Sequence, residues 1–345
     1  MREWLNRLWY PQSPPPLSTR LLALPLAALS LVFRWLVAWR NRSYDRGTRS
    51  SRVVRGVRVV SVGNLNVGGT GKTPAVICIA NLCLARGKRA AVVSRGYGRQ
   101  AKGGRVLSGG SMPSDEVGDE PLLISRRCPS VPVLVGTDRF ALAAQARDDF
   151  GAEIVLLDDG MQHRRIWRDT EIVVIDEEVG LGNGHLLPWG PLREPPQSLR
   201  RASLLWIRAS EEGSRSWPQP AIPFVRARYW VESVLDPTGT ACSVASLRGK
   251  KAFVFCGMAR PLRLVRTVQS LGAESVGSRF FPDHHSFSAR DLDSVLRMAQ
   301  VRGAELVITS EKDLARLPEG FPAWALSLEV EITEGSEHLF RLLDL

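Results

Sequence analysis

A glycine-rich segment that ends in lysine and threonine is the strongest chemical signal in this sequence. Residues 63–74 read GNLNVGGTGKTP and follow a β-branched run at residues 57–62. Between a strand and a helix, backbone N–H groups of such a loop surround phosphate oxygens. The lysine neutralises the β- and γ-phosphates, and the threonine hydroxyl binds Mg²⁺. The predicted nucleotide-binding loop consists of Asn66, Val67, Gly68, Gly69, Thr70, Gly71, Lys72 and Thr73, and Lys72 is also a predicted catalytic residue.

One position departs from the usual phosphate-loop pattern, which has a glycine five residues before Gly71. Asn66 stands there instead. Asparagine tolerates left-handed backbone better than most residues, so we expect the turn to survive. Chance is a poor explanation for Lys72, because the chain has six lysines against forty arginines.

Two aspartates end an apolar run and form the next candidate site. Residues 154–157 (IVLL) precede Asp158, Asp159 and Gly160. A hydrophobic strand that ends in aspartate is typical of the carboxylate that holds Mg²⁺ beside a phosphate loop. Asp-Gly is also a favoured turn pair, so a plain β-turn is the alternative. The sequence does not decide which aspartate contacts the metal.

Three further polar segments carry groups that can do chemistry. Asp119 precedes an apolar helical pattern and is either a helix cap or a functional carboxylate. Glu194 lies in a proline-rich loop, next to Arg193. His284 and His285 follow Asp283, and one of these histidines near a carboxylate would form an orienting or proton-relay pair.

The elements that position these residues alternate between short β-branched runs and helical patterns. We predict strands at 57–62, 90–94, 131–135, 154–157 and 172–175, with helices at 72–86 and 137–150. Residues 180–246 are rich in proline and predict loops with a few antiparallel strands. The β/α alternation then resumes to the end of the chain. This rhythm predicts a P-loop NTPase-like parallel sheet domain plus a second, smaller α/β domain.

The first 60 residues hold eleven arginines and two acids, so they carry +9 of the net charge of +11. Four of the ten tryptophans and the apolar run LLALPLAALSLVF (21–33) lie there as well. The run is shorter than the roughly 20 residues of a spanning helix. We therefore favour an interfacial helix on an anionic membrane over a short span or an ordinary soluble helix. The five cysteines form no CxxC pair, which disfavours a disulfide framework or a structural zinc site.

Taken together, the motifs resemble the tetraacyldisaccharide 4′-kinases, the membrane-associated lipid A kinases of Gram-negative bacteria. The resemblance rests on GNLNVGGTGKTP, SRGYGR (94–99), VGDEP (117–121), DDGMQHR (158–164), GPLREP (190–195), CGMARP (256–261), FFPDHHSF (280–287) and TSEKD (309–313), in this order. It runs from about residue 15 to the C-terminus. Met161 and Trp189 are small departures from the usual pattern.

The resemblance implies an ATP-dependent kinase that phosphorylates the 4′-hydroxyl of a tetraacyldisaccharide 1-phosphate. By motif, Asp119 acts on that hydroxyl and pairs with a histidine, most simply His284. Asp158, Asp159 and Glu194, together with Thr73, manage Mg²⁺. The implied cofactors are ATP and Mg²⁺, and the implied partners are the glycolipid and the cytoplasmic face of the inner membrane. Neither a nucleic acid nor an obligate protein partner is expected.

The expected organisation has four parts: an N-terminal membrane-anchoring segment (1–45), a P-loop domain (46–200), a β-rich linker (201–245) and a second α/β domain (246–345). From the residues alone, a membrane-bound ATPase or GTPase switch remains the alternative class. Val67 stands where the partitioning ATPases carry a signature lysine, and residues 310–313 (SEKD) do not fit a base-reading motif of GTPases. Outside residues 1–60 no basic stripe with interleaved aromatics indicates nucleic-acid binding.

Overall fold

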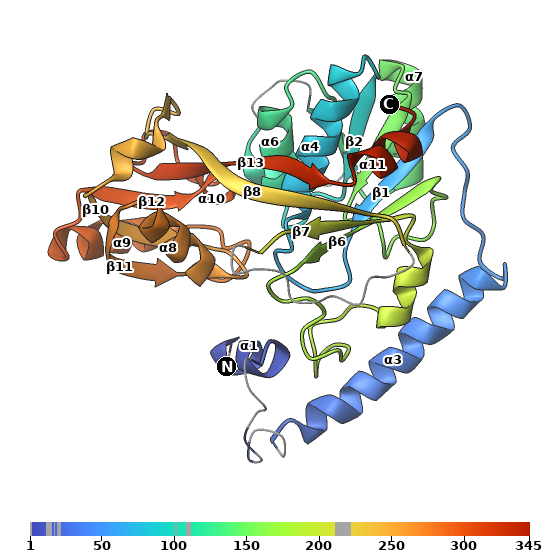
Figure 1. The fold of residues 1–345 in the computed structure, drawn as a ribbon, viewed down its shortest axis with the longest axis horizontal. Coiled ribbons are helices and arrows are strands. Elements are labelled where there is room, and N and C mark those ends of the chain that lie inside the picture. The colour runs from blue at the N-terminus through green and yellow to red at the C-terminus, as the bar shows by residue number, and fades with distance from the viewer. Residues whose placement is uncertain are drawn as a thin grey trace. The chain divides into compact units, whose positions relative to one another are not determined.

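The computed structural model describes residues 2–11, 16, 18, 22–99, 101, 103–107, 112–210 and 222–345. The chain divides into two units, each assembled from separate stretches (Figure 1). The first unit contains residues 1–93, 138–228 and 331–345, and the second contains residues 94–137 and 229–330. The predicted four-part division of the chain stays a prediction.

A parallel sheet forms the centre of the first unit. Its strands follow the order β7 (Leu204–Arg208), β6 (Thr170–Asp176), β1 (Arg58–Gly63), β5 (Ile154–Asp158) and β2 (Ala90–Ser94). These strands are predominantly apolar and almost wholly buried, as expected where helices cover both faces of a parallel sheet. Helices α4 (Lys72–Ala85) and α7 (Arg139–Phe150) pack against it.

The last helix of the chain, α11 (Ser336–Leu343), also belongs to the first unit. Leu339 and Leu343 are buried, one helical turn apart on the same face. The ring of Phe340 lies 4.3 Å from the guanidinium carbon of Arg86. The side chain of Arg58, at the start of β1, donates to the backbone carbonyl of Leu342. Helix α11 is therefore bound to β1 through two residues that are 284 positions apart in the chain.

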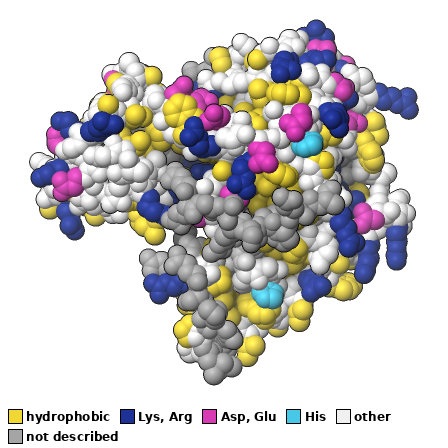
Figure 2. All heavy atoms as spheres, viewed as in Figure 1, with side chains coloured by type: hydrophobic (Ala, Val, Ile, Leu, Met, Phe, Trp, Pro, Cys, Tyr) yellow, Lys and Arg dark blue, Asp and Glu magenta, His cyan; other side chains and the backbone are white. Residues whose placement is uncertain are grey.

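Helix α3 (Leu24–Asp45) is the long N-terminal helix, and α1 (Arg2–Trp9) precedes it. Pro25 lies in the first turn of α3, where its missing N–H is tolerated. Only Ser30 and Val37 of α3 are buried, whereas Trp35 is 65% and Trp39 53% exposed. The region of Figure 2 where Figure 1 draws α3 carries apolar side chains interspersed with arginines. Among the described residues, no helix combines the length and apolar character needed to cross a bilayer.

The second unit contains a parallel run of strands, in the order β11 (Glu274–Phe280), β10 (Lys251–Cys256), β12 (Leu306–Ser310) and β13 (Trp324–Glu334). Alternate residues of β10 enter two different apolar clusters. Val254 packs with Leu264 of α8 (Pro261–Ser270), and Phe255 packs with Leu292 of α9 (Ala289–Val301). The sheet therefore has an apolar core on each face.

Residues 94–137 add a smaller substructure to the second unit. Strands β3 (Arg105–Leu107) and β4 (Val133–Val135) pair antiparallel, and helices α5 (Ser114–Val117) and α6 (Asp119–Arg127) lie between them in the chain. Helix α6 packs against the short helix α10 (Glu311–Leu314) that follows β12. Because α10 follows β12 directly, this packing places Asp119, the first residue of α6, near the C-terminal end of β12.

The predicted fold class, a mixed α/β protein with a mostly parallel sheet, is confirmed. The prediction for residues 180–246 was wrong in one respect. Strand β7 pairs parallel with both β6 and β8 (Phe224–Leu235), whereas β8 pairs antiparallel with β9 (Ala241–Cys242). Short 3-10 helices, η1 (Pro196–Arg201) and η2 (Val244–Leu247), account for other parts of this stretch. Prolines interrupt helical and strand patterns equally. The proline-rich sequence therefore did not reveal that β7 and β8 continue the sheet in parallel.

Candidate active site

The phosphate loop connects β1 to α4 in the first unit, as the sequence predicts. Gly71 caps the helix with a left-handed backbone (φ 91°), and Gly68 has φ 100°. The turn forms with Asn66 in place of glycine, but not through a left-handed backbone at this residue. Asp159, His284 and Asp344 are the non-glycine residues of the described chain with positive φ, so Asn66 is not left-handed. Its amide instead donates to the carbonyl of Gly180 at 3.0 Å, which ties the loop to a neighbouring segment.

Lys72 is the first residue of α4, and its ammonium group faces two oxygen acceptors. The Nζ atom lies 3.1 Å from Oδ1 of Asn64 and 3.3 Å from Oδ1 of Asp159. The amide of Asn64 donates to the hydroxyl of Thr70 at 2.7 Å, so Asn64 connects both ends of the loop. The lysine side chain is 14% exposed. This arrangement presents a preorganised cation at the N-terminus of a helix, where anions bind favourably.

Asp159 is held by Arg193 as well as by Lys72. Two nitrogens of Arg193 each lie 2.9 Å from a different oxygen of Asp159, a bidentate pair. Arg139 donates to the Asp159 carbonyl at 3.0 Å. Burial raises the pKa of Asp159, but the charges of Lys72, Arg193 and Arg139 outweigh it and hold the pKa far below its usual range. Asp159 is therefore a carboxylate at every physiological pH.

The residues around Asp158 fit a bound Mg²⁺. Asp158 ends β5 and is 1% exposed, and Thr73 is the second residue of α4. Mg²⁺ at nucleotide sites takes one or two carboxylates and completes its shell with phosphate oxygens and water. Within the described part of the chain, no three acidic, histidine or cysteine side chains are grouped as a complete metal site.

The contacts of Glu194 differ from those that the sequence predicted. Its side chain is fully buried and lies between Arg40 at 2.9 Å and Arg201 at 2.8 Å. Asn41 donates to its second oxygen at 2.8 Å. Burial raises the pKa of Glu194, but the arginines outweigh it and lower the pKa. With both oxygens engaged, Glu194 fits a tether between helix α3 and the loop of Arg193 better than it fits a magnesium ligand.

Asp119 lies in the second unit, at the first position of α6. Gly118 precedes it with φ 92°, and a Cβ at Gly118 would come within 3.1 Å of the backbone of Gly96 and Tyr97. Only glycine allows this close approach. The Nδ1 atom of His284 lies 3.0 and 3.2 Å from the two oxygens of Asp119. Structure and sequence therefore agree on an Asp119–His284 pair, which the fold assembles from residues 165 positions apart.

Two cations from the segment after β12 complete the surroundings of Asp119. Lys312 Nζ lies 3.6 Å and Arg316 Nε 3.8 Å from the same Asp119 oxygen. Burial raises the pKa of Asp119, which is 4% exposed. The hydrogen bond with His284 and the charges of Lys312 and Arg316 outweigh burial and lower this pKa to about 2. Asp119 is a permanently ionised carboxylate with a histidine aligned on it.

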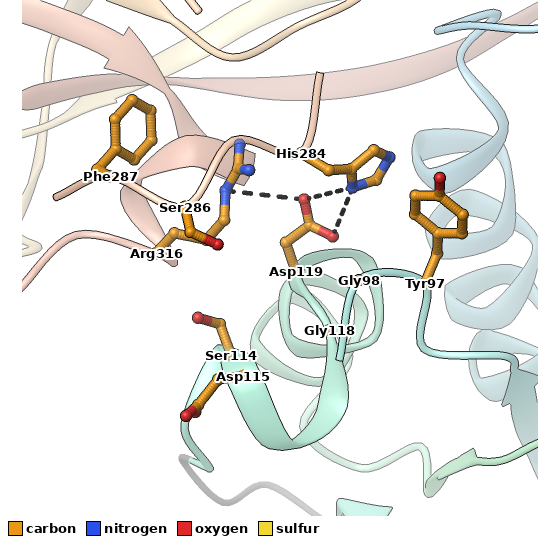
Figure 3. Close-up of a pocket in the computed structure, with 10 residues that line it drawn as sticks. All are labelled: Tyr97, Gly98, Ser114, Asp115, Gly118, Asp119, His284, Ser286, Phe287 and Arg316. Carbon is orange, nitrogen blue, oxygen red and sulfur yellow. Dashed lines mark hydrogen bonds and ion pairs between the residues drawn. The ribbon is translucent and has the colours of Figure 1, made fainter. Parts of the chain in front are cut away.

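Figure 3 shows that His284 and Arg316 point at Asp119 from two sides and that Tyr97 stands beside the imidazole. The rings of Tyr97 and His284 meet edge to face, with centroids 4.9 Å apart. The pocket is lined by Tyr97, Gly98, Ser114, Asp115, Gly118, Asp119, His284, Ser286, Phe287 and Arg316. A hydroxyl group that enters this pocket meets an ionised carboxylate oriented by an imidazole, the arrangement of a general base.

His285, the adjacent histidine, has a structural position. Its Nε2 lies 3.1 Å from Oδ2 of Asp291, and its ring stacks on Phe281 with centroids 4.8 Å apart. Asp291 also forms a capping box with Ser288 at the start of α9. His284 itself has φ 59°, which turns its side chain away from that of its neighbour. The two histidines therefore serve different clusters.

Sequence reasoning did not assign roles to three residues that the structure places in these clusters: Asn64, Arg193 and Lys312. Each lies inside a motif that supported the family resemblance, which was the signal common to all three. Lys312 carried a second signal, because it is one of six lysines in a chain that otherwise uses arginine. Arg193 and Lys312 have partners 34 and 192 positions away. The contacts of Asn64 with Thr70 and Lys72 are local in sequence, but they depend on how the loop folds.

Comparisons with known proteins agree with this geometry. A relative from Anaeromyxobacter dehalogenans (strain 2CP-C), named tetraacyldisaccharide 4′-kinase, is 41% identical over 97% of this chain and 93% of its own length. A relative of the same name from Syntrophus aciditrophicus is 39% identical over 98% of this chain and 97% of its own.

A solved structure and a family profile extend the comparison. The crystal structure of LpxK from Aquifex aeolicus in complex with ATP has a TM-score of 0.76 and 29% identity, over 94% of this chain and 99% of that one. The profile of the family described as tetraacyldisaccharide-1-P 4′-kinase matches residues 22–344. The chain therefore belongs to the tetraacyldisaccharide-1-P 4′-kinase family.

Proposed function

We propose that this protein transfers the γ-phosphate of ATP to the 4′-hydroxyl of a tetraacyldisaccharide 1-phosphate. The observation that carries the proposal is the phosphate loop with Lys72 held between Asn64 and Asp159. The lipid acceptor follows from the names of relatives that match nearly the whole chain. In this reaction the acceptor O–H bond breaks, its oxygen bonds to phosphorus, and ADP leaves with the electrons of the old P–O bond.

The nucleotide side of the reaction belongs to the first unit. Residues 66–73 bind the phosphates through backbone N–H groups, and Lys72 stabilises the charge of the transferring group. A bound Mg²⁺ neutralises phosphate oxygens, and we assign Asp158 and Thr73 to hold it. Asp159 is assigned to position Lys72 and Arg193, because both of its oxygens already face those cations. We leave Glu194 out of the magnesium set.

The acceptor side belongs to the second unit. Asp119 takes the proton of the attacking hydroxyl, and His284 orients the carboxylate. A carboxylate with a pKa of about 2 is a weak base. Phosphoryl transfer tolerates a weak base, because its loose transition state depends mainly on positioning and charge stabilisation.

A location at the cytoplasmic face of the inner membrane suits this substrate. Helix α3 exposes Leu29, Leu31, Trp35 and Trp39 beside basic residues, and it has no membrane-spanning character. An interfacial helix of this kind holds an enzyme at the depth of lipid headgroups. The 4′-hydroxyl of a membrane-embedded glycolipid lies at that depth.

The decisive experiment is acceptor dependence. Purified protein is incubated with ATP labelled at the γ-phosphate, with or without the tetraacyldisaccharide 1-phosphate in detergent, and labelled lipid and inorganic phosphate are counted. We expect label in the lipid and little phosphate release without acceptor. Release of inorganic phosphate alone, independent of the lipid, would contradict the proposal and favour a membrane-bound switch ATPase.

The same assay tests Asp119. Asp119→Asn should lower kcat by roughly 10²–10⁴, the usual contribution of a general base, with little change in the KM for ATP. Asp293→Asn, an exposed aspartate of α9 in the same unit, is the matched control and should behave as wild type. A tenfold rise in the KM for ATP at unchanged kcat would make Asp119 a binding or capping residue.

A further inference from the structure

Lys312 lies where three carboxylates and one imidazole converge. Its Nζ is 3.2 Å from Glu120, 3.6 Å from Asp119 and 3.7 Å from Asp283. It is also 3.3 Å from Nε2 of His284, the ring nitrogen that does not face Asp119. The lysine side chain is 20% exposed and belongs to the short helix α10. The role proposed for Asp119 and His284 leaves this lysine unexplained.

A charged ammonium group donates hydrogen bonds and cannot accept them. A nitrogen of His284 that faces Lys312 must therefore be the acceptor nitrogen of a neutral imidazole. The proton of that ring then sits on Nδ1, which points at Asp119. We propose that Lys312 is a positioning residue that fixes His284 in the neutral Nδ1–H tautomer, so that the imidazole donates to Asp119. This inference rests on the function proposed above and adds a residue to it.

One neighbour opposes this assignment. Oδ2 of Asp283 lies 3.9 Å from Nε2 of His284, and a carboxylate there would favour the doubly protonated imidazolium. Lys312 is closer to Nε2, and its charge also pairs with the other oxygen of Asp283. The remaining neighbour, Tyr97, presents its ring edge to face. The Lys312 ammonium group thus offsets the carboxylate that would otherwise stabilise a protonated ring.

The charge of Lys312 is permanent in the working range of pH. Burial lowers its pKa, but Glu120, Asp119 and Asp283 outweigh burial and raise the pKa above its ordinary value. Arg316, the second cation on Asp119, also donates to the carbonyl of His285 at 2.9 Å and so holds the backbone next to His284. His284 therefore lies between the ammonium group of Lys312 and the carboxylate of Asp119. The cation favours an unprotonated Nε2, and the anion favours a protonated Nδ1.

The tautomer has a consequence for the reaction. With Nε2 occupied by Lys312 and Nδ1–H donated to Asp119, the imidazole has no position left to receive the proton of the acceptor hydroxyl. That proton goes to the Asp119 carboxylate. His284 acts as an orienting donor, and Lys312 acts through it.

Nuclear magnetic resonance reports the tautomer directly. Protein labelled with ¹⁵N-histidine has five imidazoles to assign, and His284→Gln identifies the signals of His284 by their loss. At neutral pH we expect a protonated Nδ1 and an unprotonated Nε2. In Lys312→Met the ring should become an imidazolium, because Asp119 and Asp283 remain. Lys312→Arg should keep the wild-type tautomer, since a guanidinium also only donates.

Kinetics supply the second readout. Lys312→Met should lower kcat about 10- to 100-fold, as is typical when a hydrogen-bonded orienting group is lost, with the KM for ATP within about twofold of wild type. Lys312→Arg should recover most of that loss. Lys250→Met, which removes an exposed lysine paired with Glu305 at 2.7 Å, is the matched control and should change neither readout.

Three outcomes overturn the inference: an Nε2-protonated neutral ring in the wild type, an imidazolium in the wild type, or an unchanged tautomer in Lys312→Met. If Lys312→Met does not fold, the wild-type and Lys312→Arg spectra still decide, because both must show the Nδ1–H form. Absence of lipid phosphorylation by the wild type would refute the proposed function instead, whatever the tautomer.

Discussion

At the scale of single residues, Lys72 is positioned by one carboxylate and one amide, at 3.3 and 3.1 Å. Asp159 also accepts two hydrogen bonds from Arg193. Its negative charge therefore lies between the positive charges of Lys72 and Arg193 and stabilises both in one site. Without Asp159, the two cations would repel each other in a partly buried site. Asp119 has the same arrangement in the second unit, where it lies between Lys312 and Arg316.

Lys72→Ala should reduce phosphoryl transfer to a small fraction of the wild-type rate. Loss of a preorganised charge on the transferring phosphoryl group costs on the order of 10²–10³ in rate. The helix should persist, since alanine is the best helix former. Single-turnover transfer and thermal unfolding check both points. Lys88→Ala, a lysine of the same unit outside the loop, is the control, and near-wild-type turnover in Lys72→Ala would refute the phosphate-loop assignment.

Asp119 should also affect stability in a pH-dependent manner. Its folded pKa of about 2 lies below the ordinary value of 3.8. The charged form therefore stabilises the fold above about pH 4, and this stabilisation is lost as the pH falls through the folded pKa. The full contribution is about 2 kcal/mol. Denaturant unfolding of wild type and Asp119→Asn at pH 5, 4 and 3 should show a shrinking difference. A constant difference across this range would mean that the charge of Asp119 is not what stabilises the site.

At the scale of elements, helix α3 has two faces with different partners. Val37 packs into the apolar cluster that contains Leu186 and Leu192, and Arg40 pairs with Glu194. Trp35 and Trp39, one turn apart, lie on the exposed side. A helix with large apolar side chains in solvent is expected to have another surface to bind, and an anionic lipid surface suits its arginines.

The tryptophans of α3 therefore predict membrane binding. The double variant Trp35→Ser, Trp39→Ser should bind vesicles that contain anionic lipid at least about tenfold more weakly, because each buried aromatic ring contributes on the order of 1.5–3 kcal/mol. The double variant Trp167→Ser, Trp230→Ser removes two exposed tryptophans outside α3 and is the control. Vesicle co-sedimentation measures both. If both double variants lost vesicle binding to the same extent, α3 would not be the membrane-binding element.

The same elements show what could be read from the sequence. The strands and helices around the phosphate loop were predictable because apolar periodicity and glycine position are local properties. The start of α6 was predictable too, since Asp119 follows Gly118. The parallel pairing of β7 with β8 was not, because pairing direction depends on chain connections outside the strands. The preference for His284 over His285 rested on the family resemblance alone. In the structure it depends on the left-handed backbone of His284 and on partners 165 and 6 residues away.

At the scale of the whole molecule, charge is concentrated at one end of the sequence. The net charge is +11, of which residues 1–60 carry +9. In the first unit, several other arginines are neutralised by buried acids: Arg168 pairs with Glu171 and Arg226 with Glu177. The rest of the chain therefore contributes little to long-range attraction toward an anionic surface. The N-terminal segment supplies most of that attraction.

Association with anionic vesicles should consequently depend on salt. Raising the ionic strength from about 0.1 M to about 1 M shortens the Debye length from about 10 Å to about 3 Å. Binding to anionic vesicles should fall markedly, while binding to neutral vesicles, governed by the tryptophans, should change little. Co-sedimentation at both salt concentrations measures this. Salt-independent binding to anionic vesicles would show that the arginines do not contribute.

Helix α11 has a consequence for how the protein is made. It completes the nucleotide-binding unit through Leu339 and Leu343, and its backbone accepts a hydrogen bond from Arg58 at the start of the central strand. On the ribosome, residues 58–93 emerge long before residues 336–343. The phosphate-loop unit therefore remains unfinished while the second unit is synthesised, and it closes only after that unit has emerged. A translational pause or a premature stop near residue 330 would leave a nascent chain in which the residues of the second unit have been made. The sheet of the first unit would still lack helix α11.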